Sequence, residues 1–254
     1  RLGLVLWGLF LLLNASLFSA QSSALLNGTF TVNTANGQTD FKFKLPDYKI
    51  EKFQEFSKVK IDGAELTIKE GAPELPFFTV SIAVPQNSSP LLQKATVLNQ
   101  ELVKNIKVFP AQAVNSEDKS FKYDTDFYKN ETSYPQNSIQ ISNIQTLRDF
   151  NIISVNVYPF VYNPKNNELQ IKKDISFTIS HSSKNINDIY QNNAMISREF
   201  EPLYKTLIAN YEQIRSDFPV YSKPHILIIY PNTTDTNFLS SLNSLVNWKK
   251  QKGF

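Results

Sequence analysis

The sequence predicts a mainly β protein: an antiparallel β-sandwich followed by a linker helix and the first βα unit of an α/β domain. Two observations support this order. From about residue 28 to residue 181, short stretches alternate apolar and polar residues and end at Pro, Gly or Asn, which is typical of half-buried antiparallel strands. After His181 the apolar period becomes helical, and a continuous apolar run then suggests a strand covered on both faces.

The amino terminus predicts export. Leu2 to Leu13 form an apolar run that is shorter than the roughly 20 residues needed to span a membrane. Residues 1–24 therefore fit a secretory signal peptide, with Arg1 as the end of a truncated basic region and with cleavage after Ala20 or Ala24. We expect the chain in the periplasm, at the cell surface or outside the cell, without a stable membrane span. The alternative is an amino-terminal membrane anchor.

Residues 25–181 are expected to form the β-sandwich domain. Three alternating stretches supply apolar side chains that should face its core, since successive strand residues point to opposite faces. These sets are Phe41, Phe43 and Leu45; Val80, Ile82 and Val84; and Ile175, Phe177 and Ile179.

A hairpin is expected to join residues 152–162 to residues 168–180. The turn Tyr162–Asn167 contains Pro and Asn, residues that suit the backbone angles of a turn. Val155, Val157 and Val161 are expected to share one face around Pro159.

Residues 182–223 are expected to be a linker and an amphipathic helix. Ser182 to Ser197 is polar enough to be exposed. Apolar residues then recur at helical spacing behind Glu199, Glu201 and Pro202, which suit a first helical turn. The sequence therefore predicts one helix that ends before Pro219, with an apolar face of Leu203, Leu207, Ile208, Tyr211 and Ile214.

Residues 224–254 are expected to begin an α/β domain that is truncated at Phe254. The continuous apolar run Ile226–Tyr230 predicts a strand of a parallel sheet. Thr234 or Asp235 can cap the following helix, and lysines in its last turn suit the helix dipole.

Composition excludes several kinds of chemistry. The chain has no Cys, so it can form no disulfide and holds no thiol nucleophile. A formal net charge of +3 without a dense basic block makes nucleic acid an unsuitable partner. His181 and His225 are the only imidazole bases, and their positions at strand ends favour structural or solvated roles over catalysis. We therefore expect no catalytic residue and no cofactor.

Two other clusters have a functional and a structural interpretation. Glu117–Asp118 and Asp124–Asp126 could suggest calcium, but no Gly provides the sharp turn of such a loop, so solvated carboxylates and no metal site are expected. An aromatic group could bind a sugar or a protein surface, although aromatic residues of a β-sandwich are usually core. This group consists of Tyr123, Phe127, Tyr128 and Tyr134.

Several motifs in a fixed order also carry a family resemblance. They are Gly71–Pro76 before the strand Thr79–Val84, Leu147–Phe150, Val157–Phe160, Tyr162–Pro164, Leu169–Ile171, His225–Tyr230 and Leu242–Gly253. In this order they resemble the precursors of gingipain-type cysteine peptidases, which have a signal peptide, a β-sandwich propeptide and a caspase-like α/β catalytic domain. The family's catalytic His and Cys follow later strands, so the resemblance assigns no catalytic residue to this chain.

The resemblance implies a propeptide that keeps a downstream peptidase latent and can assist its folding until an activating protease removes it. The partners would be that peptidase domain, within the same chain, and the activating protease. A cut should fall in exposed, flexible backbone, which favours Arg198 and Lys184 over Arg215 in the predicted helix.

Two alternatives stay open. One is a secreted adhesion or carbohydrate-binding β-sandwich attached to an unrelated α/β domain. The other is a relative of the gingipains whose catalytic domain has lost its His and Cys.

Overall fold

The computed structural model describes residues 29–85, 88–113, 120–181, 195–215, 220–223 and 225–254. The predicted signal peptide with Ala20 and Ala24, the acidic pair Glu117–Asp118, and Lys184 lie outside the described residues. Within these ranges, no helix has both the length and the apolar character needed to cross a membrane.

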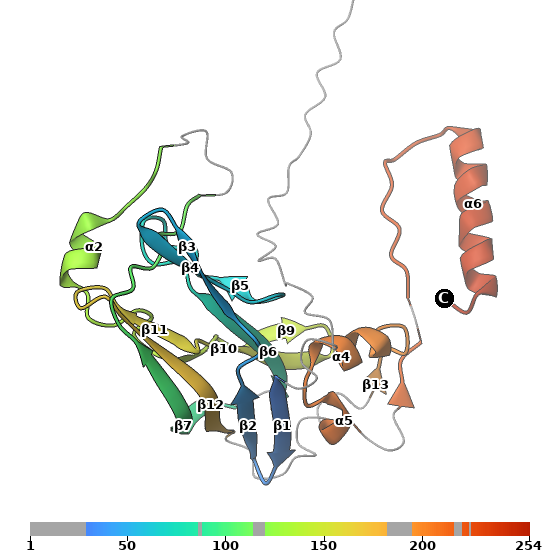
Figure 1. Ribbon diagram of the computed structural model, residues 1–254. Helices are drawn as coiled ribbons and strands as arrows, with labels where there is room; N and C mark the ends of the chain where they lie inside the picture. The colour runs from blue at the N-terminus through green and yellow to red at the C-terminus, as the bar shows by residue number, and fades with distance from the viewer. Residues whose placement is uncertain (1–28, 86–87, 114–119, 182–194, 216–219, 224) are drawn as a thin grey trace, which may run out of the picture.

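Two five-stranded sheets form the body of the molecule (Figure 1). The first sheet contains β1 (Phe30–Ala35), β2 (Gln38–Lys44), β12 (Glu168–Ser180) and β11 (Phe160–Asn163) in that order, and β7 (Leu91–Val103) also pairs with β12. The second contains β5 (Glu65–Leu66), β6 (Pro76–Val84), β10 (Phe150–Val157) and β8 (Ile139–Ile141), and β9 (Gln145–Leu147) also pairs with β10. All pairs in both sheets are antiparallel, which confirms the predicted mainly antiparallel β class.

Side chains from both sheets form one core cluster, so the sheets pack face to face. Phe41 of β2 stacks on Phe177 of β12 with 4.5 Å between ring centroids. The alternating residues predicted to face inward are buried, except for Leu45, which packs at the margin. The buried members are Phe41, Phe43, Phe78, Val80, Ile82, Val84, Ile139, Ile153, Val155, Val157, Ile175, Phe177 and Ile179.

A second cluster lies beside α2 (Thr125–Asn130) and the hairpin of β3 (Lys49–Phe53) with β4 (Phe56–Lys60). Phe127 and Tyr128 of α2 are buried in it. The Tyr128 hydroxyl donates to the Val108 carbonyl at 2.7 Å. Tyr123 and Tyr134 are partly buried and pack against the same cluster, so the aromatic group belongs to the core and its margin, in agreement with the structural interpretation.

The predicted hairpin is right only in part. β11 pairs with the start of β12 across the turn at residues 164–167, where Asn167 has a φ of 53°. However, β10 belongs to the other sheet and pairs with β6. The chain crosses between the sheets at Tyr158–Pro159, where the Pro159 carbonyl accepts from Lys172 N at 2.8 Å. This crossing also moves Val161 off the buried face that Val155 and Val157 share.

The single helix predicted after residue 199 is wrong. Two short helices, α4 (Glu201–Leu207) and α5 (Tyr211–Ile214), stand in its place. Ile208 separates them in an extended conformation, with φ −107° and ψ 104°. The predicted exposure of residues 182–197 also fails at its described end, because Ile196 and Ser197 are buried.

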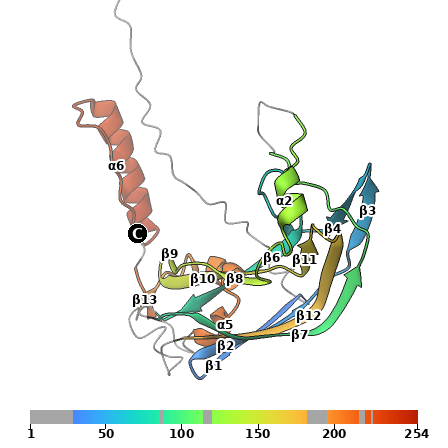
Figure 2. The same cartoon turned by 90° about the vertical axis from the view of Figure 1, so that its left-hand side faces the viewer.

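The carboxyl-terminal segment has its helix but lacks its predicted strand. Helix α6 (Thr236–Gln251) begins after Asp235, whose carboxylate accepts from Asn237 N and Phe238 N, and Lys249 and Lys250 lie in its last turn. The run at residues 226–230 is not a strand. No described strand lies beside it to pair with its backbone, and both views show α6 away from the two sheets (Figure 2). None of the α6 residues is buried.

Candidate processing region

Residues 195–215, which contain the predicted cut at Arg198, pack on the second sheet. Helices α4 and α5 pack Tyr204, Tyr211 and Ile214 against Ala83 of β6 and against Phe150 and Ile152 of β10. Leu203, which was predicted to lie on the apolar face, is exposed instead. The Phe150 ring meets the Tyr204 ring edge-on, with centroids 4.9 Å apart. This region is therefore part of the two-sheet body. Its buried apolar residues in this cluster are Ile196, Tyr204, Ile208, Tyr211 and Ile214.

The break between α4 and α5 lets the chain bind the free edge of β6. Ala209 N donates to the Ser81 carbonyl at 2.8 Å. The fully buried Asn210 side chain accepts from Ala83 N at 2.9 Å and donates to the Ala83 carbonyl at 3.1 Å. A continuous helix could not present these groups to β6, because its own backbone hydrogen bonds would use the amide of Ala209.

Gln213 of α5, three residues after Asn210, makes the same kind of contact with β1. Its side chain accepts from Thr34 N at 2.6 Å and donates to the Val32 carbonyl at 2.7 Å. Residues three apart lie on the same side of a helix. Asn210 and Gln213 thus join α5 to β6 of the second sheet and to β1, the edge strand of the first sheet, and we call these two side chains the amide bridge.

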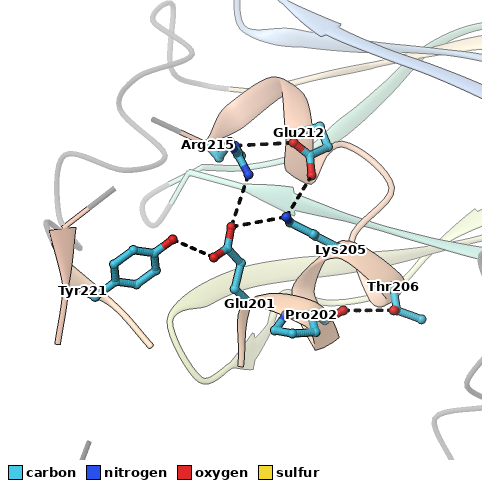
Figure 3. A network of polar contacts seen from close by, with 7 residues as sticks. All are labelled: Glu201, Pro202, Lys205, Thr206, Glu212, Arg215 and Tyr221. Carbon is cyan, nitrogen blue, oxygen red and sulfur yellow. Dashed lines mark hydrogen bonds and ion pairs between the residues drawn. The ribbon is translucent and has the colours of Figure 1, made fainter. Parts of the chain in front are cut away.

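Glu201 is the centre of a polar network on the outer side of this region (Figure 3). Its carboxylate accepts from the Tyr221 hydroxyl at 2.7 Å and pairs with Arg215 at 3.2 Å and Lys205 at 3.6 Å. Glu212 also pairs with Lys205 and Arg215. The network joins α4, α5 and β14 (Val220–Tyr221), and β14 in turn pairs in parallel with β13 (Met195–Ile196).

These contacts shift the titration of the groups involved. The hydrogen bond from Tyr221, together with the cations Lys205 and Arg215, lowers the pKa of Glu201 against the opposing effect of burial. The same hydrogen bond raises the pKa of Tyr221. Burial and a hydrogen bond to Asp149 raise the pKa of Tyr204. Glu201 is therefore held as a carboxylate.

Arg198 lies in an exposed turn between β13 and α4, with its guanidinium 4.6 Å from the Tyr221 ring centroid. A protease could reach this turn. The buried residues of α4 and α5 follow it in the chain, so a cut after Arg198 would leave residues 199–215 packed on the sheet. Lys184, the other predicted position, lies outside the described residues.

Arg215, which the sequence disfavoured as helical, directly follows Ile214, the last buried residue in the described part of the chain. It is the C-cap of α5 in an extended conformation, with φ −71° and ψ 149°, so it lies at the end of the helix. The spacing of Tyr211 and Ile214 before the polar pair Ser216–Asp217 could have marked this boundary.

The remaining candidate residues have no catalytic arrangement. His181 Nε2 lies 2.8 Å from Thr39 Oγ1, and His225 is exposed. Asp124 caps α2 by accepting from Phe127 N at 2.9 Å. Among the described residues, no three His, Cys, Asp or Glu side chains are grouped so that they could hold a metal ion.

Curated proteins similar to this chain come from Porphyromonas gingivalis. Lys-gingipain HG66 is 25% identical over 263 residues, an alignment that covers 96% of this chain and 15% of that protein. Gingipain R2 is 26% identical over 204 residues and covers 76% of this chain and 26% of that protein. The chain thus spans a small part of the length of these relatives.

Two solved structures share the fold. The complex of Porphyromonas gingivalis RgpB pro- and mature domains matches with a TM-score of 0.60 and 21% identity, over 74% of this chain and 98% of that chain. A structure that addresses the zymogenic latency of gingipain K matches with a TM-score of 0.52 and 23% identity, over 61% of this chain and 94% of that chain. The Propeptide_C25 family model matches residues 37–217, which contain α4, α5 and every strand of the two sheets except β1. The chain therefore belongs to the Propeptide_C25 family.

Proposed function

We propose that this chain is the propeptide region of an exported gingipain-like cysteine peptidase precursor and keeps that peptidase latent until proteolysis removes it. The observation that carries the proposal is the agreement between the family match, which ends at residue 217, and the end of the buried body at Ile214. The sequence contains no Cys, so the thiol of such a peptidase would belong to another part of the precursor.

Tethering supplies the physical reason for latency. A propeptide in the same chain as its peptidase has a high effective concentration, roughly millimolar for a short flexible linker. A modest interface can then cover the active site. Cutting the chain removes the tether, and the propeptide becomes an ordinary, weaker inhibitor.

We propose two processing positions with different consequences. A cut after Arg198, or after Lys184 in the same connection, would open the chain but leave α4 and α5 attached by their buried face and the amide bridge. A cut after Arg215 would fall beyond Ile214, the last buried residue of the described ranges. After this second cut, the contacts of β14 with β13 and of Tyr221 with Glu201 are those that would still hold the following segment in the described part of the chain.

The proposal is tested in the complete precursor, including the region that follows Phe254. We compare peptidase activation in the wild type, Arg198→Gln and Arg215→Gln, with Arg148→Gln as a control because Arg148 is a partly exposed arginine of the body. Arg215→Gln should retain bound propeptide in size-exclusion chromatography and delay activation, whereas Arg148→Gln should activate as the wild type does. Full activity in an uncleaved precursor would reject latency.

A second experiment measures inhibition in trans. Residues 25–215 are added to the active peptidase up to high micromolar concentration, because the tether is absent. Dose-dependent loss of activity is expected. If this assay shows no inhibition and the uncleaved precursor is active, the adhesion or carbohydrate-binding interpretation becomes the better one.

A further inference from the structure

We propose that His181 is an acid-sensitive lock: its protonation weakens a buried chain of hydrogen bonds that holds α5 against β1 of the first sheet and β6 of the second. The chain begins at the end of β12, where His181 N donates to the Gly37 carbonyl at 2.7 Å. His181 Nε2 lies 2.8 Å from Thr39 Oγ1.

From Thr39 the contacts continue to the amide bridge. Thr39 Oγ1 lies 2.9 Å from Thr34 Oγ1, and Asn210 Nδ2 donates to Thr34 Oγ1 at 3.1 Å. Asn210 in turn holds both backbone groups of Ala83. Thr39 and Asn210 are fully buried and Thr34 is 5% exposed, so water does not substitute readily for these partners.

The direction of donation links this chain to the protonation state of His181. Asn210 donates to Thr34, so the Thr34 hydroxyl can donate to Thr39, and Thr39 can donate to Nε2 of a neutral ring. An imidazolium carries hydrogens on both nitrogens and cannot accept at Nε2. Nε2–H would then donate to Thr39 Oγ1, and the Thr39 hydroxyl would have to turn away from the ring. Within the contacts of this chain of hydrogen bonds, one of the two threonine hydrogens then has no acceptor.

The surroundings of the other ring nitrogen disfavour the charge of the imidazolium. His181 Nδ1 is buried and has no hydrogen-bond partner in the described part of the chain. The neutral ring that accepts at Nε2 already carries its hydrogen on Nδ1, so the added cost of protonation there is that of a charge in a dry site. Burial accordingly lowers the pKa of His181.

The charged groups on the neighbouring elements are engaged elsewhere. On β2, the Asp40 carboxylate accepts from Thr178 Oγ1 at 2.6 Å. On α5, Glu212 pairs with Lys205 and Arg215. No carboxylate occurs in residues 179–181, at the end of β12, or in residues 30–35 of β1. Among the described residues, none of these acids is hydrogen-bonded to the ring to stabilise an imidazolium.

The sign of the pH effect follows from linkage. A histidine whose pKa is lowered by folding is neutral in both states at high pH, where its contribution to stability is complete. As the pH falls through the unfolded value of about 6.5, the unfolded chain binds a proton that the folded chain does not, so stability is lost. The limiting slope for one proton is a tenfold change in the unfolding constant per pH unit.

The chain's two histidines provide the test and its control. Urea unfolding of the full chain is measured from about pH 8 to pH 5, around the ordinary histidine pKa. His225→Gln alters the exposed histidine and should lose stability with falling pH as the wild type does. In His181→Gln, the slope of the unfolding free energy against pH should be smaller by the contribution of about one proton. Parallel curves for wild type and His181→Gln would overturn the proposal.

Two measurements on the wild type keep the test valid if His181→Gln does not fold. In an NMR titration, His181 should titrate at a lower pH than His225; equal values would reject the lock. Hydrogen-exchange protection of Ala209 and Ala83 should fall at acidic pH more than that of Phe41, whose amide lies in β2. Uniform loss of protection would also reject it.

These stability tests do not depend on the proposed function. If the lock operates in a latent precursor, acid should loosen α4 and α5 and so expose the cut after Arg215, and this consequence does rest on the proposed function. If stability depends on pH through His181 as predicted but acid does not change precursor cleavage, only that consequence is rejected. If His181 contributes nothing to the pH dependence of stability, the lock is rejected and the latency proposal is unaffected.

Discussion

Replacement of Asn210 by Ala tests how strongly the two sheets depend on α5. The substitution removes three hydrogen bonds: two to the backbone of Ala83 and one to Thr34 Oγ1. The side chain is fully buried, so the amide and carbonyl of Ala83 lose their partner in a dry environment.

The size of the effect follows from those orphaned groups. A buried polar group without a partner costs about 1–3 kcal/mol. The two backbone groups of Ala83 together would lower the free energy of unfolding by about 2–6 kcal/mol. Some relaxation or water entry should bring this loss toward about 3 kcal/mol. A loss of that size lowers the folding equilibrium constant by about a hundredfold.

Urea unfolding followed by far-ultraviolet circular dichroism measures this loss, with the slope of the transition as a check that the same surface unfolds. Asn33→Ala is the matched control, because Asn33 is exposed on β1 next to Thr34. It should change stability by less than about 0.5 kcal/mol. A loss below about 1 kcal/mol for Asn210→Ala would refute the reasoning, since a typical hydrogen bond alone contributes that much.

Three further substitutions test other parts of the structure. Glu201→Ala should cost about 1 kcal/mol in low salt and less in 1 M salt, since salt screens its pairs with Lys205 and Arg215; equal losses would contradict the ion-pair contribution. Tyr162→Phe should cost about 1–2 kcal/mol, because its buried hydroxyl donates to the Ile106 carbonyl at 3.0 Å; an unchanged urea midpoint would argue against this. Phe177→Ala should lower the free energy of unfolding by about 3–5 kcal/mol and Phe177→Leu by much less. Equal melting temperatures for these two variants would show that the core is not closely packed.

The strands that the sequence predicted well are those whose burial alternates without interruption. Phe41 and Phe43 in β2, like Ile175 and Phe177 in β12, face one core on one side and a polar surface on the other. That situation produces a period of two. β6 also alternates, but Ala83 is buried on the opposite face because α4 and α5 cover it.

The errors arose where long-range contacts override a local pattern. The spacing of Ile208 and Tyr211 fits one helix, but hydrogen bonds from Ala209 and Asn210 to β6 stabilise a break. The residues around Pro159 fit one continuous strand, and only the pairing partners reveal that two sheets share them. The apolar run at residues 226–230 forms no strand because a buried parallel strand needs neighbours on both sides.

The position of the candidate processing region could be predicted only in outline. Exposure of Arg198 followed from the polar composition around it. The attachment of the following helices did not, because the same apolar residues could have served a free amphipathic helix. The burial of Tyr204 and Ile214 against the second sheet decides which cut could separate the chain.

The amide bridge also fixes the order in which the body can be completed. Gln213 binds Thr34 across 179 positions of sequence, and β2 needs β12 from the far end of the body. As the chain emerges amino terminus first, β1 and β2 can form only a local hairpin and must wait for residues 168–215. Such distant pairings make folding slow compared with a helical bundle. α5 can therefore close the two sheets only after Gln213 has emerged.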